Sequence, residues 1–558
     1  MAETVGTVFA ALSIIDLCDK YGKRLVSLCR QYQNYDAGLD EIILSIQGAW
    51  LKMEVQLRTL TALWDKLHPP LQALYHDVLT SLGTKLMSAF ESFQVTQGHS
   101  NAASTMRQKL KVVYLKRQLT LTVADMEEWQ KKFDPSWYLI TRIANPDVDK
   151  RLDHVKARVP QPAAVSSTRL AKMRESINQI SSRSMEGGGQ SIFKEAAVVA
   201  DEMTRIKGTT AYLSRYRGDG RRILLDPANL AGQASTVTAR VNIRDLARLL
   251  LHIDPATFNL LRCDGVVELP ISQGTQKQTQ FHLLFEIPDG LSSPITLRSL
   301  LEDAPKISLS DRFQLAKQLA RSVTFVHAAG FVHKNIRPET VLVFDEINSA
   351  TNRKSRRKSL GSSFLIGFER VRKAEGRTDK FGDLEWAKNL YRHPFRQGLQ
   401  PEDVFEMRHD IYSLGVCLLE IALWQSFVQI TIVATAKETD NVGEEKEVEE
   451  PRPDALATSS EETIPWSELN ISTELAEENH RRGALTIKNK LVALAKDSLP
   501  SLVGERYTSV VLACLCCLDE DSEDNSFRYE KDMEDKDGII VGVRYIENVL
   551  SKLEELFV

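Results

Sequence analysis

The segment from His333 to Leu342 carries the polar side chains whose chemistry is most informative. It places an imidazole, an amide and a hydroxyl, those of His333, Asn335 and Thr340, directly after an apolar stretch. A carboxylate in such a loop could accept a proton or bind a divalent cation. The amide of Asn335 cannot take up a proton near neutral pH, and the hydroxyl of Thr340 is a poor substitute for an anionic metal ligand.

The order of residues in this segment, His-Lys-Asn-Ile-Arg-Pro-Glu-Thr, resembles the catalytic loop of protein kinases. In that family the pattern is H-R-D-L-x-x-x-N, in which the Asp accepts the proton of the substrate hydroxyl and the Asn holds the second magnesium ion. Asn335 stands at the first of these positions and Thr340 at the second. The resemblance therefore implies a kinase-like loop in which both groups have been replaced.

Segments on both sides of the loop match the same family at its usual spacing. Apolar residues recur with a helical period from Phe313 to Ala329, where a kinase has a long C-lobe helix. Ser363 to Glu369 stands in place of the strand and the D-F-G triplet, with Gly367 where the magnesium-binding Asp would be. His409 to Glu420 resembles the buried helix D-x-[YW]-S-x-G, which holds the catalytic loop from below, and Pro394 is the only part of A-P-E that is kept.

The segments that would form the N-lobe keep less of the kinase pattern. Arg221 to Ala228 is the nearest match to the V-A-I-K strand, and it carries no lysine at its end. Gly218-Asp219-Gly220 is either a remnant of the glycine-rich loop or an ordinary turn, and such turns are several times more frequent. Val241 to Leu251 predicts the next helix, and Phe281 to Pro288 predicts the strand and hinge that lead into the C-lobe.

Phosphoryl transfer depends on positioning and on charge neutralisation, so the loss of the base, the metal ligands and the lysine predicts a pseudokinase. We expect no metal and no cofactor, although nucleotide binding without metal is left open. An atypical active kinase is the alternative, and Asp345 and Glu369 are the nearby acids that could serve it.

The composition sets wider bounds. The chain has 558 residues, 43% of them hydrophobic, and a formal net charge of -4. This length predicts about two to four domains, and the charge gives no reason to expect a nucleic-acid partner. The seven cysteines lie mostly in apolar helical runs without metal-ligand spacing, which predicts reduced core residues in an intracellular protein.

The first stretch of the chain has no charged residue between Glu3 and Asp16. It is too short for a permanent membrane span, which needs about 20 apolar residues, and it lacks the basic start of a secretory signal. We expect a core helix in the resting protein, and alternatively a helix that can leave the core and insert into a membrane. The membrane-insertion candidates recur at helical spacing: Val5, Val8, Phe9, Leu12 and Ile15.

Long helical patterns continue from Gly38 to about Trp137, with a break at Pro69-Pro70, and predict an all-α bundle. The residues from Ile15 to Lys23 and from Ala37 to Ile42 resemble the HeLo domain of filamentous fungi, the family of the prion-controlled cell-death protein HET-S. That resemblance implies a four-helix bundle over residues 1–158, similar to that of the mixed-lineage kinase domain-like executioner of necroptosis.

A second group of residues fits a membrane-binding bundle. No acidic residue lies between Ser92 and Ala124, and basic residues cluster in this stretch. Each basic group near an anionic leaflet contributes on the order of 1 kcal/mol. A solvated helix face is the equally weighted alternative. The lipid-headgroup candidates are Arg107, Lys109, Lys111, Lys116 and Arg117.

Residues 159–207 are expected to be a linker with one short helix around Leu170 to Ile180 and a second from Ser191 to Ile206. By analogy with the necroptosis family, these helices would couple the bundle to the pseudokinase. The pseudokinase would span residues 208–558, with an α+β N-lobe at about 208–290 and a C-lobe at about 291–558. Lys354 to Ser359 and Glu438 to Glu450 predict a solvated loop and a disordered excursion.

Together these patterns predict a multidomain chain that is cytoplasmic at rest and acts at the plasma membrane when activated. The hypothesis is a fungal cell-death effector in which an upstream kinase or receptor acts on the pseudokinase, the chain oligomerises, and the first helices permeabilise the membrane. A cytosolic scaffold that never contacts lipid is the second alternative.

Overall fold

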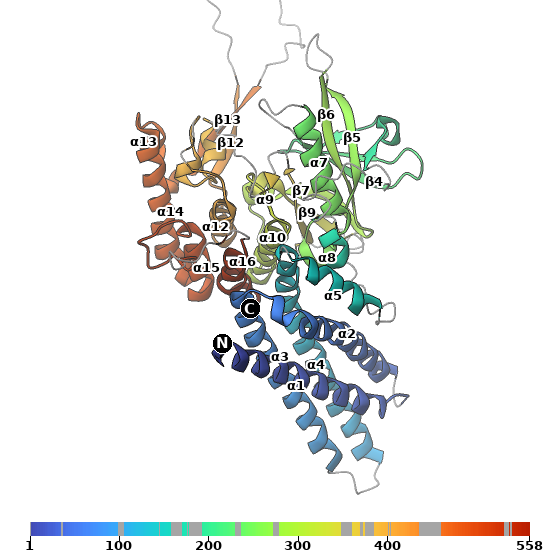
Figure 1. The fold of residues 1–558 in the computed structure, drawn as a ribbon. Helices are drawn as coiled ribbons and strands as arrows, with labels where there is room; N and C mark the ends of the chain where they lie inside the picture. The colour runs from blue at the N-terminus through green and yellow to red at the C-terminus, as the bar shows by residue number, and fades with distance from the viewer. Residues whose placement is uncertain are drawn as a thin grey trace, which may run out of the picture.

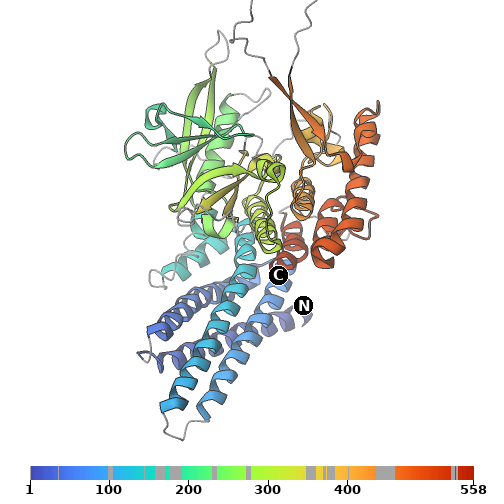
Figure 2. The ribbon, with the colours of Figure 1, turned by 180° about the vertical axis from the view of Figure 1, so that it is seen from behind.

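The computed structural model describes residues 2–34, 37–98, 105–143, 145–157, 170–175, 177, 192–228, 236–271, 278–346, 360–368, 372–373, 384–399, 401, 403–434, 459–528, 535 and 538–557. These residues form an N-terminal helical region and a C-terminal α+β region with mixed sheets (Figure 1). In both views the helical region lies below the α+β region, and the labelled ends of the chain lie near the junction (Figure 2).

Long helices pack side by side in the helical region. α1 packs against α2 and α3, and α4 packs against the same two helices. The break predicted at Pro69-Pro70 is confirmed, because α3 begins there, and proline fits the first turn since it has no N–H to leave unbonded. The bounds are α1 Ala2–Arg30, α2 Ala37–Leu63, η1 Trp64–Lys66, α3 Pro69–Gly98, α4 Thr105–Leu139, η2 Ile140–Arg142 and α5 Pro146–Ala157.

Aromatic side chains fill the centre of the helical region. Trp129 and Phe133 on α4 stack with ring centroids 4.6 Å apart, and Tyr75 on α3 contacts Phe133 at 5.5 Å. The buried Tyr75 hydroxyl donates a hydrogen bond to the carbonyl of Ser136 at 2.9 Å, so its polar end is satisfied. Gly22 on α1 faces the indole of Trp50 on α2, where a Cβ atom would lie 1.9 Å from the ring.

Residues 170–175 and 177 are helical, in agreement with the first helix predicted for the linker. The second predicted helix, Ser191 to Ile206, is wrong. The chain there forms β1 Phe193–Lys194, η3 Ala196–Val198 and β2 Thr204–Arg205. The helix-forming run of alanines is overridden because Phe193 and Lys194 pair in parallel with the edge of β5.

Within the described residues, the largest sheet has the strand order β1-β5-β6-β4-β3-β2 and is antiparallel except for the β1–β5 pair. Helix α7 Thr236–Leu251 packs on β5 and β6, where a helix was predicted. Gly218 to Gly220 lies in the turn that joins β3 to β4. The remaining strands are β3 Tyr212–Arg215, β4 Arg222–Ala228, β5 Cys263–Ile271 and β6 Gln278–Glu286.

A helical layer with three smaller sheets completes the α+β region. The long helices predicted around Phe313–Ala329 and His409–Glu420 are present as α10 and α12. The strands are β7 Leu291–Thr296, β8 Phe331–Val332, β9 Val341–Glu346, β10 Ser362–Leu365, β11 Arg372–Lys373, β12 Val428–Ala434 and β13 Ser459–Pro465. The helices are α8 Pro255–Phe258, α9 Leu297–Asp303, α10 Leu309–Ala328, η4 Pro338–Thr340, α11 Trp386–Asn389, η7 Pro394–Arg396, α12 Met407–Leu423, η8 Ser467–Leu469, α13 Ser472–Leu475, α14 His480–Val503, α15 Glu505–Leu515, α16 Ile539–Tyr545, η9 Ile546–Leu550 and α17 Ser551–Glu554.

All seven cysteines are free and buried, which agrees with their prediction as core residues. Burial raises the pKa of the Cys263 thiol to about 12, so this side chain stays protonated and behaves as a small apolar group.

We expect Gly22→Ala to loosen the packing of α1 on α2, because its Cβ would overlap the Trp50 indole. Overpacking of this kind costs about 1–3 kcal/mol. Hydrogen exchange of peptides from α1 and α2, measured by mass spectrometry, should become faster. Gly48→Ala on α2 is the control, since no atom lies within 4 Å of its Cβ position, and it should slow exchange slightly. Equal exchange in both variants would contradict the packing described for Gly22.

Candidate functional site

The fold brings together Asn335, Thr340 and Gly367, the three residues that the sequence analysis compared with kinase positions. The Asn335 side-chain amide donates a hydrogen bond to the carbonyl of Gly367 at 3.2 Å. The Thr340 hydroxyl lies 2.8 Å from the carbonyl of Asn335 and 2.9 Å from that of Arg337. Asn335 and Thr340 are both buried, so these side chains hold the backbone of the loop and do not point into solvent.

Gly367 has a backbone conformation and surroundings that exclude a larger residue. Its φ is +84°, in the left-handed region that glycine adopts without strain. A Cβ atom at this position would lie 2.5 Å from Thr340 Cγ2 and 3.2 Å from Asn335 Nδ2. An aspartate could therefore not replace Gly367 without movement of the loop.

Asp226 on β4 completes this cluster, and the sequence comparison did not single it out. Its Oδ2 accepts hydrogen bonds from the backbone N–H groups of Gly367 at 2.8 Å and Phe368 at 3.0 Å. The side chain is 1% exposed. An acidic residue inside an apolar strand was the signal that could have revealed it, because a buried carboxylate requires hydrogen-bond donors. The strand expected to carry the lysine therefore carries a carboxylate instead.

Asp410 on α12 holds the other side of the loop. Its carboxylate accepts hydrogen bonds from the backbone N–H groups of His333 at 2.7 Å and Lys334 at 2.9 Å, and it lies 3.2 Å from His327 Nε2. Burial acts to raise the pKa of Asp410, but the hydrogen bond to His327 and the nearby imidazoles bring it below its ordinary value. The expectation that this helix holds the loop from below is confirmed by these bonds.

Burial keeps the imidazoles of His333, His393 and His409 neutral at physiological pH, because it lowers their pKa. Burial lowers the pKa of His333 to about 4, and its ring contacts Phe368 with centroids 4.9 Å apart. Burial likewise lowers the pKa of His409 to about 3 and that of His393 to about 2. The imidazoles of His333, His393 and His409 therefore pack without carrying charge.

A buried ionic network links the helices next to the loop. Arg298 on α9 lies 3.1 Å from Glu339 Oε1 and 3.2 Å from Glu420 Oε1, and it donates to the Tyr391 hydroxyl at 2.6 Å. Burial raises the pKa of Glu420 to about 7, although the Arg298 charge opposes this change. Since Arg298 is 1% exposed, loss of either partner would leave a charge buried without compensation.

The membrane-insertion candidates lie on α1. Ile15 is buried in the core, and Leu12 is half-buried against it, which agrees with the predicted core helix. Val5, Val8 and Phe9 belong to the same helix, but their side chains lie outside the described residues.

The lipid-headgroup candidates lie on α4. Arg117 is exposed and Lys116 is half-buried, whereas the side chains of Arg107, Lys109 and Lys111 lie outside the described residues. Large apolar side chains stand beside Arg117 on this helix, since Val113 is 65% exposed and Leu121 is 52% exposed. Their spacing of four residues places Val113, Arg117 and Leu121 on one exposed face.

Other predicted features are placed as follows. Asp345 belongs to β9, on the strand that leaves the loop, whereas Glu369 and the insertions from Lys354 to Ser359 and from Glu438 to Glu450 lie outside the described residues. In the described part of the chain, no helix has both the length and the apolar character to cross a bilayer. No group of three or more His, Cys, Asp or Glu side chains among the described residues is arranged to hold a metal ion.

No protein-family model matches the chain, and a comparison with curated proteins also found no match.

We expect Asp226→Asn to release the backbone at Gly367 and Phe368. The amide lacks the negative charge, and hydrogen bonds to a charged group contribute about 1.5–3 kcal/mol each. Hydrogen exchange of peptides covering residues 363–368 should therefore become faster. The control is Asp201→Asn, because this carboxylate is 94% exposed and pairs with Arg217 at the surface. If Asp226→Asn and the wild type exchange at the same rate, Asp226 does not hold this segment.

We expect the α+β region to lose stability as the pH falls below about 6.5. The buried His333, His393 and His409 stay neutral when folded, whereas each unfolded histidine takes up a proton near its ordinary pKa of about 6.5. Each of these histidines lowers the free energy of unfolding by up to about 1.4 kcal/mol for every pH unit below that value. Glu420 opposes this trend, because its raised pKa favours the folded state as the pH falls from about 7 toward 4.5.

Calorimetric unfolding between pH 7 and pH 5 would measure how steeply the free energy of unfolding changes with pH. This slope is proportional to the number of protons taken up on unfolding. His333→Phe should reduce that number by about one, since phenylalanine can pack on Phe368 and does not titrate. His76 is half-buried on α3, and His76→Phe is the matched control because it removes one imidazole from the helical region. A slope that His333→Phe does not change would contradict a buried neutral imidazole.

Proposed function

We propose that the chain is a catalytically inactive pseudokinase that controls an N-terminal four-helix bundle of the HeLo type. When released, the bundle oligomerises and permeabilises membranes, and so executes regulated cell death. The α+β region would then be a two-lobed kinase-like fold, with the large sheet in one lobe and α10 in the other. Residues 1–158 would be the bundle, residues 159–207 the linker, and residues 208–558 the pseudokinase.

The cluster around the loop supports the absence of phosphoryl transfer. Asn335 and Thr340 use their side chains to hold backbone, and Gly367 has no room for a carboxylate. Strand β4 carries Asp226 and no lysine, whereas the strand that it resembles in kinases carries a lysine that binds phosphates.

The observation that carries the proposal is the direct contact between the end of α4 and the segment that leads into this loop. The Thr141 hydroxyl donates to the carbonyl of Ala328 at 2.8 Å. Arg142 lies against Gly330, where a Cβ atom would be 2.2 Å from Arg142 Nη1. Ala328 and Gly330 precede His333 by only a few residues, so movement of the loop would reach α4 without an intervening domain.

Further contacts seat the end of α4 on the α+β region. Leu139 packs on Gly542 of α16, where a Cβ atom would lie 2.8 Å from Leu139 Cδ2. Tyr138 contacts Phe258 edge-on at 4.5 Å and Phe325 at 6.5 Å. The interface is thus apolar and closely packed, and a partner that separates it must overcome these contacts.

The linker also binds the turn that follows α4. Arg174 is 2% exposed and donates to the carbonyls of Ile140 at 2.6 Å and Ile143 at 3.0 Å. Its guanidinium also pairs with Asp149 on α5 at 2.6 Å. A signal that moves the linker would remove these bonds from the turn that follows α4, which is the regulatory role proposed for it.

The exposed face of α4 supports the proposed membrane step. Val113, Arg117 and Leu121 combine apolar side chains with a cation, which suits the boundary between lipid headgroups and acyl chains. The resting protein would be cytoplasmic and the active oligomer would act at the plasma membrane. Its partners would be anionic lipid, further copies of this chain, and an upstream kinase or receptor.

Gly542→Leu tests the proposed release. A leucine would push α16 away from Leu139, so we expect leakage from vesicles containing anionic lipid to rise on the order of tenfold. Gly48→Leu is the matched control, because it adds the same side chain where no atom lies within 4 Å of the Cβ position. Deletion of residues 1–20 from the Gly542→Leu variant should abolish leakage. The double substitution Val5→Glu and Phe9→Glu should also abolish leakage when it is added to the full-length Gly542→Leu variant.

Two results would refute the proposal. One is vesicle leakage by the deletion variant that equals that of its full-length parent. The other is a Gly542→Leu variant that unfolds at a lower temperature but leaks no faster than the Gly48→Leu control, which would favour a scaffold without membrane activity.

A further inference from the structure

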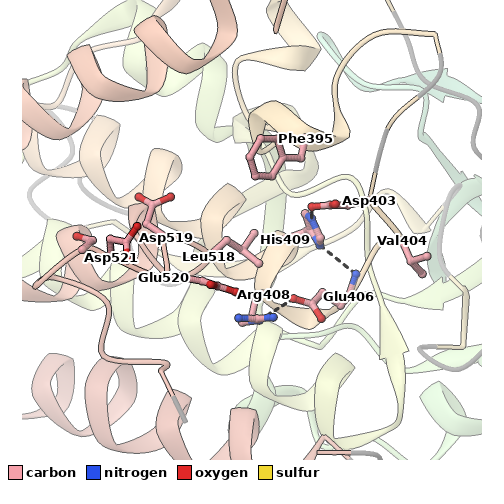
Figure 3. Close-up of a pocket in the computed structure, with 11 residues that line it drawn as sticks. Phe395, Asp403, Val404, Glu406, Arg408, His409, Leu518, Asp519, Glu520 and Asp521 are labelled. Carbon is pink, nitrogen blue, oxygen red and sulfur yellow. Dashed lines mark hydrogen bonds and ion pairs between the residues drawn. The ribbon is translucent and has the colours of Figure 1, made fainter. Parts of the chain in front are cut away.

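A hollow of about 650 Å³ lies on the outer side of α12, beside the buried cluster that holds the loop. It is bordered by residues 395–409 on one side and by the turn after α15, residues 518–522, on the other (Figure 3). The start of α12 forms part of the wall, through the residues that directly precede Asp410.

The wall of the hollow has an apolar part. Phe395, Val404 and Leu518 line it, and Val404 is 60% exposed. Exposed aromatic and aliphatic side chains at a concave surface gain free energy when a ligand covers them, at about 25 cal/mol per Å² of apolar area. This part can therefore take an apolar side chain of a ligand.

The rim is acidic, as Figure 3 shows for several of its side chains. Glu406 pairs with Arg408 at 2.6 Å, and Asp519 pairs with Lys488. Asp403, Glu520 and Asp521 line the same hollow outside those two pairs. Arg481 is a cation near the opening, with its guanidinium 5.0 Å from the Phe395 ring centroid. The balance of the lining is negative and favours a positively charged ligand.

His409 is a second and independent feature of the hollow. Its side chain is 2% exposed, and its Nδ1 accepts a hydrogen bond from the backbone N–H of Glu406 at 3.0 Å. A neutral imidazole that accepts at Nδ1 carries its proton on Nε2. Within the described residues Nε2 has no hydrogen-bond partner, and the nearest carboxylate oxygen, Asp403 Oδ2, is 3.8 Å away. A ligand that brings an acceptor to Nε2 would satisfy this buried donor.

We propose that this hollow binds an extended basic peptide segment of a partner protein. A peptide carbonyl accepts the hydrogen bond from His409 Nε2, an Arg or Lys side chain pairs with the Asp403, Glu520 and Asp521 carboxylates, and an apolar side chain covers Phe395 and Leu518. A small organic cation lacks the acceptor, and no described group of three acidic or imidazole side chains is arranged for a metal ion. This site stands apart from the proposed membrane activity.

The partner site also has a route to the loop. His409 and Asp410 are consecutive on α12, and Asp410 accepts the backbone hydrogen bonds of His333 and Lys334. A peptide bound at His409 therefore lies one residue from the carboxylate that fixes the loop. Occupancy of the hollow would be communicated through the first turn of α12.

Fluorescence anisotropy with the full chain tests the inference. The probe is a fluorescein-labelled nonapeptide of Gly, Ala and Leu with two Arg residues, and the counterpart carries Glu in place of Arg. We expect the basic peptide to bind at least about tenfold more tightly than the acidic one, because each tenfold step needs only about 1.4 kcal/mol. The triple variant Asp403→Asn, Glu520→Gln, Asp521→Asn should lose at least about tenfold in affinity for the basic peptide.

The control removes the same charge elsewhere, through Asp77→Asn, Asp153→Asn and Asp201→Asn at exposed positions. It should bind the basic peptide as the wild type does. Equal binding of the two peptides would overturn the proposal, since it means that the acidic rim does not select the ligand. An equal loss of affinity in the control and in the triple variant of the hollow would overturn it too, since it means general charge attraction. The proposal would also be overturned if the triple variant of the hollow unfolds at the wild-type temperature and keeps full affinity for the basic peptide.

Discussion

The loop from His333 to Thr340 keeps its shape because a buried carboxylate binds its backbone. Asp410 is completely buried and accepts two main-chain hydrogen bonds, from His333 and Lys334. Lys334 has a φ of +65°, a conformation that an L-residue keeps only where the surroundings impose it. The position of the loop therefore depends on α12, and so does the position of the residues that are hydrogen-bonded to the loop.

The opposite side of the loop is closed by the protein itself. Asp226 binds the backbone of Gly367 and Phe368, and Asn335 binds Gly367 from the loop, so β4, β10 and the loop share one hydrogen-bonded cluster. These hydrogen bonds join segments far apart in the sequence through side chains and backbone alone.

The helical region is coupled to that cluster by contacts at small residues. Gly330 and Gly542 allow Arg142 and Leu139 to approach the backbone of the α+β region more closely than any side chain would permit. Such contacts are sensitive to small displacements, because dispersion attraction falls steeply with distance. Each region also has its own core, with aromatic side chains in the helical region and an ionic network in the α+β region.

The sequence by itself determined the helices, the break at Pro69, and the strands and helices on either side of the loop, because these follow from apolar periodicity and proline chemistry. The same local preferences wrongly predicted a helix from Ser191 to Ile206, since pairing with β5 is a long-range interaction. Only the tertiary structure decided that Asp226 meets Gly367 and that Arg142 meets Gly330, residues separated by more than a hundred positions. Local sequence patterns do not reveal contacts between residues so far apart in the chain. The hydrogen-bonded cluster around Gly367 and its contact with the helical region could therefore be recognised only in the folded structure.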